Sequence, residues 1–397
     1  MRSFVDSRFR LILVTVLLLT GCGSGSGSTG TGGGGGGTGT TPQAAAPTIS
    51  TTASNGAQGG AVIATIATTT SGATIYYTID GSTPTKSSTQ YIAPFLIASN
   101  LTVNAITTAS NYTNSTVTTQ AFTANIASNT LVWSDEFTNA TSQNTLPSAS
   151  NWTYDTGYQC CGNGEQETYC AAGSSTSPCS TSSPNAYIAP GGGLNIVAET
   201  TLATGVYTSA RLKSQGLFSF QYGRIEAKMT VPESQGMWPA FWLLGNNITT
   251  VSWPSCGELD VMEHIDGNDT PFGGPGNGAA PGYDWIAGSV HGGASGSAEE
   301  NGSEQYTTSG FSAAATHTYG MIWSKGEIEY YVDDSSKPYA IYKSTDAAWS
   351  PTPWPFDSGP QFILLNLAVG GSWPGNVDST TVFPSTMQVQ YVRIYSN

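Results

Sequence analysis

The sequence has 397 residues, which is enough for two or three domains. Its 12 Lys and Arg are outnumbered by 26 Asp and Glu, so the formal net charge is −14 at pH 7. This balance argues against nucleic acid and against heavily sulfated polysaccharides as partners, because either polyanion would be repelled. Only 10% of the residues are charged and 48 are Gly, which is typical of many short strands joined by turns and of an extracellular setting.

Residues 1–22 are predicted to be an export signal. Arg8 and Arg10 precede an apolar run from Leu11 to Leu19, which is too short to span a bilayer as a stable helix. The run ends in Leu-Thr-Gly-Cys at Cys22, which resembles a bacterial lipobox, in which the Cys becomes the lipidated N-terminus after cleavage. We therefore expect an exported lipoprotein of the cell envelope or cell surface, attached to the membrane through a lipid on Cys22. The alternative is an ordinary secretory signal that is cut nearby.

The next segment, residues 23–46, is predicted to be a flexible tether. It is rich in Gly, Ser and Thr and contains a run of six glycines from Gly32 to Gly37. Such a composition cannot bury an apolar core. The tether would hold the rest of the chain away from the membrane surface.

Residues 47–125 are expected to form a small domain of their own. The stretch Ala73–Ile79 alternates in the manner of a strand, and Asp80-Gly81 follows it as a hairpin-type turn. The pattern resembles the C-terminal-type module of chitobiases and hexosaminidases, a small immunoglobulin-like β-sandwich that is common in secreted carbohydrate enzymes. Its tyrosines could stack on sugar, but aromatic side chains in a sandwich belong more often to the core. We therefore predict a spacer module.

The remaining region, residues 131–397, repeats short apolar runs separated by Gly, Pro, Asn and Asp. Examples are Leu194–Ala198, Ile225–Val231 and Gln361–Leu367. Many strands without intervening helices favour two antiparallel sheets packed face to face over a βαβ architecture. The predicted fold class is therefore all-β.

Three carboxylates lie close together in this region, in Glu258-Leu-Asp260-Val-Met-Glu263. In a regular strand Glu258 and Asp260 would share a face and Glu263 would point away from them. One extra residue near Val261 or Met262, a β-bulge, would return Glu263 to the same face. The sequence therefore predicts a wall with three acids on a bulged strand.

Buried carboxylates repel one another and are costly to desolvate, so three of them kept together on an apolar strand indicate a functional role. The matching chemistry is glycoside hydrolysis, in which one carboxylate attacks the anomeric carbon and a second donates a proton to the leaving oxygen. Asp260 would orient Glu258, and its charge would help to keep the proton on Glu263. The alternatives for this pattern are a calcium site or a solvated edge strand.

The motifs of this region resemble the catalytic core of glycoside hydrolase family 16. The bulged Glu-x-Asp-x-x-Glu form is similar to that of the laminarinase-type endo-β-1,3-glucanases of this family, whereas its lichenases carry an unbulged Glu-x-Asp-x-Glu. The resemblance implies a jelly-roll sandwich with an open substrate cleft. It runs in the expected order through Tyr222–Lys228, Gly236–Leu244, Trp253–His264, Ser289–Gly292, His317–Gly320 with Trp323, and Asn366–Gly371.

Sugar recognition is expected from aromatic faces and a few polar side chains. Trp238 and Trp253 are the predicted platforms for sugar rings, and Trp242 and Trp373 are further candidates beside the same motifs. By alternation, Trp238 and Trp242 share one face of their strand. The resemblance also places Arg211 and His291 in the cleft. No cluster of His, Cys and Asp has the spacing of zinc ligands.

If Cys22 is lipidated, five cysteines remain in an oxidising compartment. Cys170 and Cys179 bracket a Gly/Ser/Pro loop and are the preferred pair. Cys256 could then bond to Cys160 or Cys161, which would brace the strand that carries Glu258. The sequence alone leaves this connectivity open.

Many family members hold a structural calcium with backbone oxygens near the start of the domain and an Asp close to the C-terminus. This chain has Gln390 at the corresponding place, and an amide oxygen is a weaker ligand for a hard cation than a carboxylate. The resemblance therefore suggests a structural calcium, whereas Gln390 argues against it, and no cofactor is expected to be required.

Together these observations predict a monomeric, retaining endo-β-1,3-glucanase that acts on a neutral polysaccharide such as laminarin. Glu258 would be the nucleophile, Glu263 the acid/base and Asp260 their partner. One alternative is a preference for mixed-linkage glucan or a galactan within the same family. Another is a non-catalytic glycan-binding surface protein, against which the complete set of three acids argues.

Overall fold

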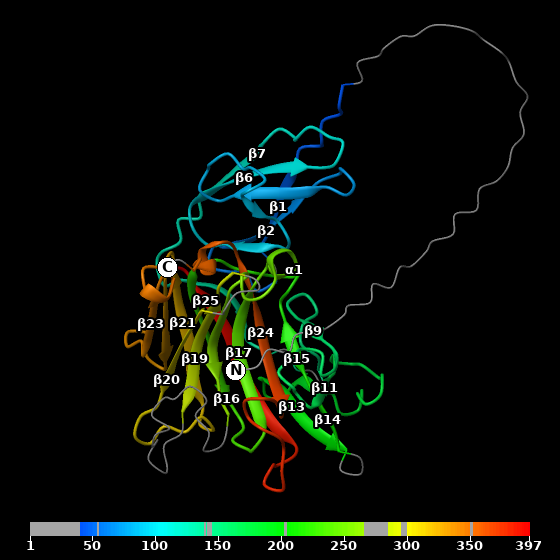
Figure 1. Cartoon of the computed structure of the whole chain (residues 1–397), viewed down its shortest axis with the longest axis vertical. Coiled ribbons are helices and arrows are strands. Elements are labelled where there is room, and N and C mark those ends of the chain that lie inside the picture. Colours follow the sequence, from blue (N-terminus) through cyan, green and yellow to red (C-terminus); the bar gives the residue numbers. More distant parts are fainter. Residues whose placement is uncertain are drawn as a thin grey trace, which may run out of the picture. The chain divides into compact units, whose positions relative to one another are not determined.

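The computed structural model describes residues 40–53, 55–138, 140, 145–201, 205–265, 285–294, 300–349 and 352–397. Residues 41–397 form one compact unit, built almost entirely from strands (Figure 1). The predicted export signal, Cys22 and most of the predicted tether lie outside the described residues. Within the described ranges, no helix is long and apolar enough to cross a bilayer.

The N-terminal module is a sandwich of two small sheets, as predicted. Its core contains Tyr77, which is 4% exposed and stacks on Phe95 with 5.0 Å between ring centroids. Tyr91 meets Tyr77 edge to face, so these rings serve the packing of the module. One sheet has the order β1 (Thr48–Thr52), β2 (Val62–Ala67), β5 (Phe95–Ile97), and the other β4 (Thr89–Gln90), β3 (Thr74–Thr78), β6 (Leu101–Thr108), β7 (Thr118–Phe122).

The larger sandwich packs a sheet of seven strands against a sheet of eleven, which confirms the predicted all-β class. Figure 1 labels β19, β17, β24 and β15 in this order across the seven-stranded sheet, and β18 lies between β19 and β17. The order in this sheet is β20 (Glu300–Tyr306), β19 (Ile286–Gly292), β18 (Glu258–Glu263), β17 (Met237–Gly245), β24 (Gln361–Val369), β15 (Arg211–Lys213), β9 (Thr153–Asp155).

The eleven-stranded sheet forms the opposite layer. Its main path runs through β10 (Gly157–Tyr158), β11 (Glu167–Tyr169), β14 (Val206–Ser209), β13 (Leu194–Thr201), β25 (Ser385–Tyr395), β16 (Gly223–Thr230), β21 (His317–Ser324), β22 (Glu327–Val332), β23 (Ala340–Lys343). Two further strands join it, β12 (Ala186–Ile188) on β13 and β8 (Leu131–Asp135) on β25. The helical elements among the described residues are short: α1 (Ile248–Val251), η1 (Ala347–Trp349) and η2 (Pro355–Asp357).

Strands β17 and β24 form the centre of the seven-stranded sheet, and their sequences explain why. All nine residues of β24 are buried, so this strand reads as a nearly continuous apolar run. In β17, Phe241 and Leu243 are fully buried in the sandwich core. The alternate residues of β17, among them Trp238 and Trp242, lie on the opposite face of the sheet, where they line a cleft.

The module has its own core, but some of its buried residues also join the apolar core of the larger sandwich. Ala57 and Leu96 of the module belong to the same buried cluster as Trp133 and Phe218 of the sandwich. The indole N–H of Trp133 donates a hydrogen bond of 2.7 Å to the carbonyl oxygen of Asn55. Trp133 also stacks on Phe218, with 4.6 Å between the ring centroids.

Candidate active site

The predicted β-bulge lies in β18. In the pairing with β17, Phe241 is opposite Met262 and Trp242 is opposite Asp260, so Val261 is the extra residue. The pairing with β19 shifts at the same place, between Asp260 and Glu263. The bulge therefore turns Glu263 to the face of Glu258 and Asp260, and all three carboxylates line one cleft. This part of the sequence prediction is confirmed.

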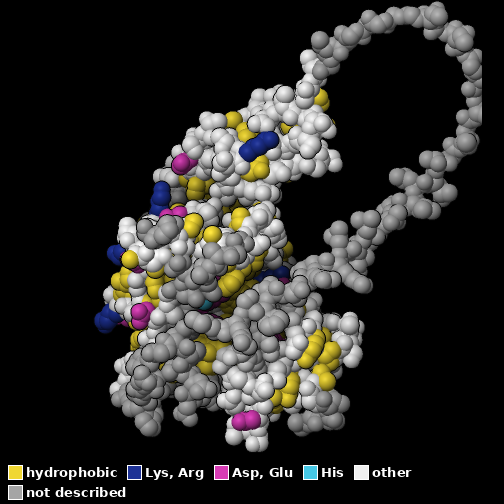
Figure 2. All heavy atoms as spheres, in the orientation of Figure 1, with side chains coloured by type: hydrophobic (Ala, Val, Ile, Leu, Met, Phe, Trp, Pro, Cys, Tyr) yellow, Lys and Arg dark blue, Asp and Glu magenta, His cyan; other side chains and the backbone are white. Residues whose placement is uncertain are grey.

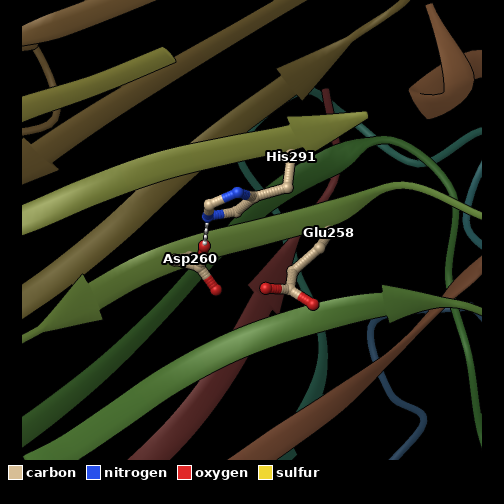
Figure 3. A group of neighbouring side chains, drawn as sticks. All are labelled: Glu258, Asp260 and His291. Carbon is tan, nitrogen blue, oxygen red and sulfur yellow. Dashed lines mark ion pairs between the residues drawn. The ribbon is translucent and has the colours of Figure 1, made fainter. Parts of the chain in front are cut away.

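Glu258 and Asp260 point from β18 toward the same side of the sheet, and His291 approaches them from the neighbouring β19 (Figure 3). Nε2 of His291 lies 2.9 Å from Oδ2 of Asp260. One carboxylate oxygen each from Glu258 and Asp260 and one ring nitrogen of His291 all lie within 4.8 Å of one another. Asp260 is 3% exposed, whereas Glu258 is half-buried at the cleft surface, where a substrate can reach it. His291 therefore holds Asp260 in place. Unlike in the sequence prediction, it is not among the residues that line the cleft.

Glu263 is held in the protonated form. Burial, and after it the negative charges of Asp260 and Glu258, raise the pKa of Glu263 to about 8, against the opposing effects of His291 and of a hydrogen bond from Trp238. The bond from Trp238 Nε1 to Glu263 Oε1 is 2.9 Å long and fixes the orientation of the carboxyl group. A carboxylic acid that keeps its proton near neutral pH can act as a general acid.

The cleft has a volume of about 360 Å³ and crosses the strands of the seven-stranded sheet. From β17 it takes Trp238, Ala240, Trp242 and Leu244, which confirms the expected alternation along this strand. The other residues that line it are Cys161, Asn163, Glu165, Arg211, Ile248, Trp253, Glu258, Asp260, Glu263, Asn366 and Ala368.

The four predicted aromatic residues have different surroundings. Trp253 is 44% exposed at the cleft and offers a ring face to a sugar. Trp238 is half-buried in the cleft wall and also contacts Glu263. Trp242 is 8% exposed, and the Arg211 guanidinium lies over its ring at 4.6 Å. Trp373 packs edge to face against Trp238 and is not among the cleft-lining residues, so its position is that of a support.

Arg211 lies on β15, two strands from β17, and lines the cleft as predicted. Its Nε lies 3.0 Å from Oδ2 of Asp155 on the adjacent edge strand β9. The ion pair and the stacking on Trp242 hold the guanidinium in one place.

The loop and strand residues on the β15 side of the cleft were not predicted from the sequence. Asn366 lies next to Arg211 across the β15–β24 pair and accepts a hydrogen bond of 2.8 Å from the indole of Trp242. Glu165 lines the cleft and is only 3% exposed. The available signal was the pair of acids Glu165 and Glu167, two residues apart in a chain with few charges.

The disulfide predictions are partly correct. Cys170 and Cys179 are bonded, as expected. The proposed bond from Cys256 to Cys160 or Cys161 is wrong, because Cys160 and Cys161 are bonded to each other and Cys256 is a free, buried thiol. Cys256 packs with apolar residues of the sheet such as Trp242 and Phe362. Burial, with the nearby charge of Glu258, raises the pKa of this thiol to about 12.

The residues at the family's calcium position do not favour a hard cation. Gln390 is exposed. At the start of the domain, Glu136 accepts two hydrogen bonds from Arg393, of 2.9 and 2.8 Å. Asp135 accepts hydrogen bonds from Asn151 and from the Trp152 indole. These carboxylates are already engaged, so calcium enters no step of the chemistry considered below.

Comparison with known sequence families gives two matches. The profile "Glycosyl hydrolases family 16" matches residues 179–393. The profile "Chitobiase/beta-hexosaminidase C-terminal domain" matches residues 53–119, in the N-terminal module. Both agree with the resemblances inferred from the sequence.

Individual relatives and solved structures support the same assignment. A beta-glucanase of Rhodothermus marinus is 36% identical over 273 residues, covering 67% of this chain and 84% of that protein. The clotting factor G alpha subunit of Tachypleus tridentatus is 32% identical over 67% of this chain, but the match spans only 34% of that protein. The laminarinase catalytic domain of Thermotoga maritima has a TM-score of 0.54 at 33% identity, with 68% of this chain and 99% of that chain covered. The structural likeness confirms the predicted jelly-roll fold.

Proposed function

Because the chain belongs to glycosyl hydrolases family 16, we propose that it is a retaining, endo-acting hydrolase that cleaves β-1,3 linkages in a neutral, laminarin-like glucan. The observation that carries the proposal is the wall of three carboxylates, in which Glu258 is open to the cleft and Glu263 keeps its proton. An open cleft that crosses the sheet accommodates the interior of a polysaccharide chain, which favours endo cleavage.

In the first step, a carboxylate oxygen of Glu258 attacks the anomeric carbon and forms a covalent glycosyl-enzyme, while Glu263 donates its proton to the departing glycosidic oxygen. In the second step, Glu263, now ionised, takes a proton from water, and the resulting nucleophile releases the sugar from Glu258 with net retention. Asp260 stabilises the proton on Glu263 through its charge and is itself held by His291.

The chemistry of the surface agrees with a neutral substrate. The net charge of −14 disfavours polyanions. On the face drawn in Figure 2, the surface of the described residues is mostly uncharged, with scattered Lys, Arg, Asp and Glu side chains. In the cleft, the exposed ring of Trp253 offers an apolar plane to the C–H face of a glucosyl unit.

Product analysis tests this function against its alternatives. We expect short β-1,3-linked oligosaccharides from laminarin early in the reaction, and NMR should show the β-anomer as the first product. Preferred cleavage of mixed-linkage glucan or agarose would assign another specificity within the family. Binding of laminarin without new reducing ends would favour a non-catalytic glycan-binding protein, and an α-anomer as first product would contradict retention.

We further propose that the chain is exported and acts as a monomeric lipoprotein, held to a membrane by a lipid on Cys22. The Leu-Thr-Gly-Cys sequence supports this proposal. We expect the wild-type protein, expressed in a bacterium with lipoprotein processing, to partition into the detergent phase. Cys22→Ser should move it to the aqueous phase, and equal partitioning of the two would contradict the anchor.

A further inference from the structure

A second pair of carboxyl groups lies at the β15 side of the cleft, apart from the three acids on β18. Glu165 is 3% exposed and Glu167 is 1% exposed, and Glu165 lines the cleft beside Asn163 and Arg211. The mechanism above uses neither residue. Charged groups this deeply buried are retained only with compensating partners.

The hydrogen bonds of this pair are incomplete without an extra proton. Oε2 of Glu167 accepts a bond of 2.8 Å from the backbone N–H of Val369, at the end of β24. Oε1 of Glu167 and Oε2 of Glu165 are buried, and neither has a donor. A carboxylate oxygen can only accept, so one proton between the two groups satisfies both oxygens.

The electrostatics agree with this arrangement. Burial, and after it the charge of Glu165 and a hydrogen bond with Glu165, together raise the pKa of Glu167 to about 8, while the hydrogen bond from the backbone N–H of Val369 opposes this shift. The other titratable groups near the pair are Tyr169 on β11 and Arg211 on β15, whose partner is Asp155 on β9. Burial, the charges of the two glutamates and a hydrogen bond with Glu165 raise the pKa of Tyr169 well above its usual value, so its hydroxyl stays neutral and also helps to hold Glu165.

We propose that Glu165 is a substrate-binding residue, whose charged carboxylate accepts a hydrogen bond from a hydroxyl group of a glucosyl unit on the β15 side of the cleft. Glu167 acts through Glu165 as a positioning residue, because the shared proton fixes the Glu165 side chain. A glucan that crosses the sheet from β18 over β17 and β24 reaches Arg211 and Glu165. The inference rests on the proposed function and names a specificity contact within it.

Two isosteric substitutions separate the two roles. Glu165→Gln keeps the contact with Glu167, because the new amide can donate to the unpartnered oxygen, but it removes the charge that binds the sugar. We expect the dissociation constant for laminari-oligosaccharides to rise about 10- to 100-fold, the range for loss of a charge-assisted hydrogen bond. Glu167→Gln supplies an N–H in place of the shared proton, and its amide oxygen can still accept from Val369.

The binding experiment uses the Glu258→Ala background, so that the ligand is not hydrolysed. Titration calorimetry with laminarihexaose is carried out between pH 6 and 9.5. With Glu167 present, affinity should fall as the pH rises through about 8, because loss of the proton leaves two repelling carboxylates. With Glu167→Gln this fall should be much smaller, although Glu263 titrates equally in both proteins.

Glu199→Gln is the matched control, because Glu199 lies on β13, outside the cleft, and accepts a hydrogen bond from Ser183. Unchanged affinity in Glu165→Gln, with an intact melting transition and with laminarin hydrolysis by the wild type, would overturn the inference alone. An unaltered pH dependence of binding in Glu167→Gln would likewise overturn the inference alone. A wild type that neither cleaves nor binds glucan would overturn both this inference and the proposed function.

Discussion

Glu258→Ala is expected to reduce laminarin hydrolysis at least about a thousandfold, because it removes the atom that forms the covalent intermediate. Glu258 is half-buried at the cleft surface, and its neighbour Leu259 fills the core on the opposite face of β18. The substitution should therefore leave the fold intact and retain glucan binding. Initial rates from reducing-end assays, together with a thermal melt, measure both effects.

The control for this variant is Glu329→Ala, which removes a half-buried carboxylate from β22 in the opposite sheet. It should change hydrolysis little. Substantial hydrolysis by Glu258→Ala, in a preparation free of wild-type enzyme, would remove Glu258 from the role of nucleophile. A lost melting transition would instead indicate a structural role for the side chain.

Glu263→Gln should lower turnover of laminarin by about 10²- to 10⁴-fold, the usual contribution of a general acid. Hydrolysis of an aryl laminaribioside with a good leaving group should decline far less in its first step, since the departing phenolate needs no proton. In the wild type, kcat/KM on laminarin should fall as the pH rises through about 8, because Glu263 then loses its proton. Steady-state rates on both substrates over this pH range test the assignment.

Asp260→Asn tests the assignment of Glu263 through the direction in which the pH profile shifts. The charge of Asp260 is the second cause, after burial, of the raised pKa of Glu263. A neutral amide should lower this pKa and move the alkaline fall in kcat/KM to lower pH. An alkaline limb that stays in place in Asp260→Asn, or that persists in Glu263→Gln, would show that another group titrates.

The raised pKa of Glu263 also makes the stability of the folded protein depend on pH. Because the folded protein binds this proton more tightly than the unfolded chain does, its contribution to stability is fully present below about pH 4.5, the ordinary pKa. It is lost as the pH rises through about 8. Glu263→Gln should therefore melt at a higher temperature than the wild type at alkaline pH, a gain in stability that accompanies the loss of turnover.

The catalytic wall could be predicted from the sequence because its signal is local. Leu259, Val261 and Met262 have to be buried, and Glu258 and Glu263 can then share a face only if one residue breaks the alternation. The pairing of β18 with β17 has this break at Val261. The same local reasoning placed Trp238 and Trp242 on the cleft side of β17.

Contacts made by segments far apart in the sequence could not be predicted in this way. The partner of Glu167 is the backbone of Val369, 202 residues along the chain. The free state of Cys256 depends on which face of the sheet it occupies, and the bond between Cys160 and Cys161 leaves no partner for it. The packing of Trp373 against Trp238 likewise depends on the arrangement of distant loops. Spacing along the chain carries no information on these pairings.

The extra residue in β18 implies that this strand can be one residue shorter and still place its three acids on one face. Removing Val261 would leave Glu-Leu-Asp-Met-Glu, in which regular alternation alone would set the three acids on one side. Val261 and Met262 are both buried, so the shorter strand would give up one apolar side chain from the interior but keep its chemistry. The extra residue shifts the alternation of side chains by one position, and the bulge shifts it back. Ancestral chains could therefore gain or lose one residue here without passing through an inactive enzyme.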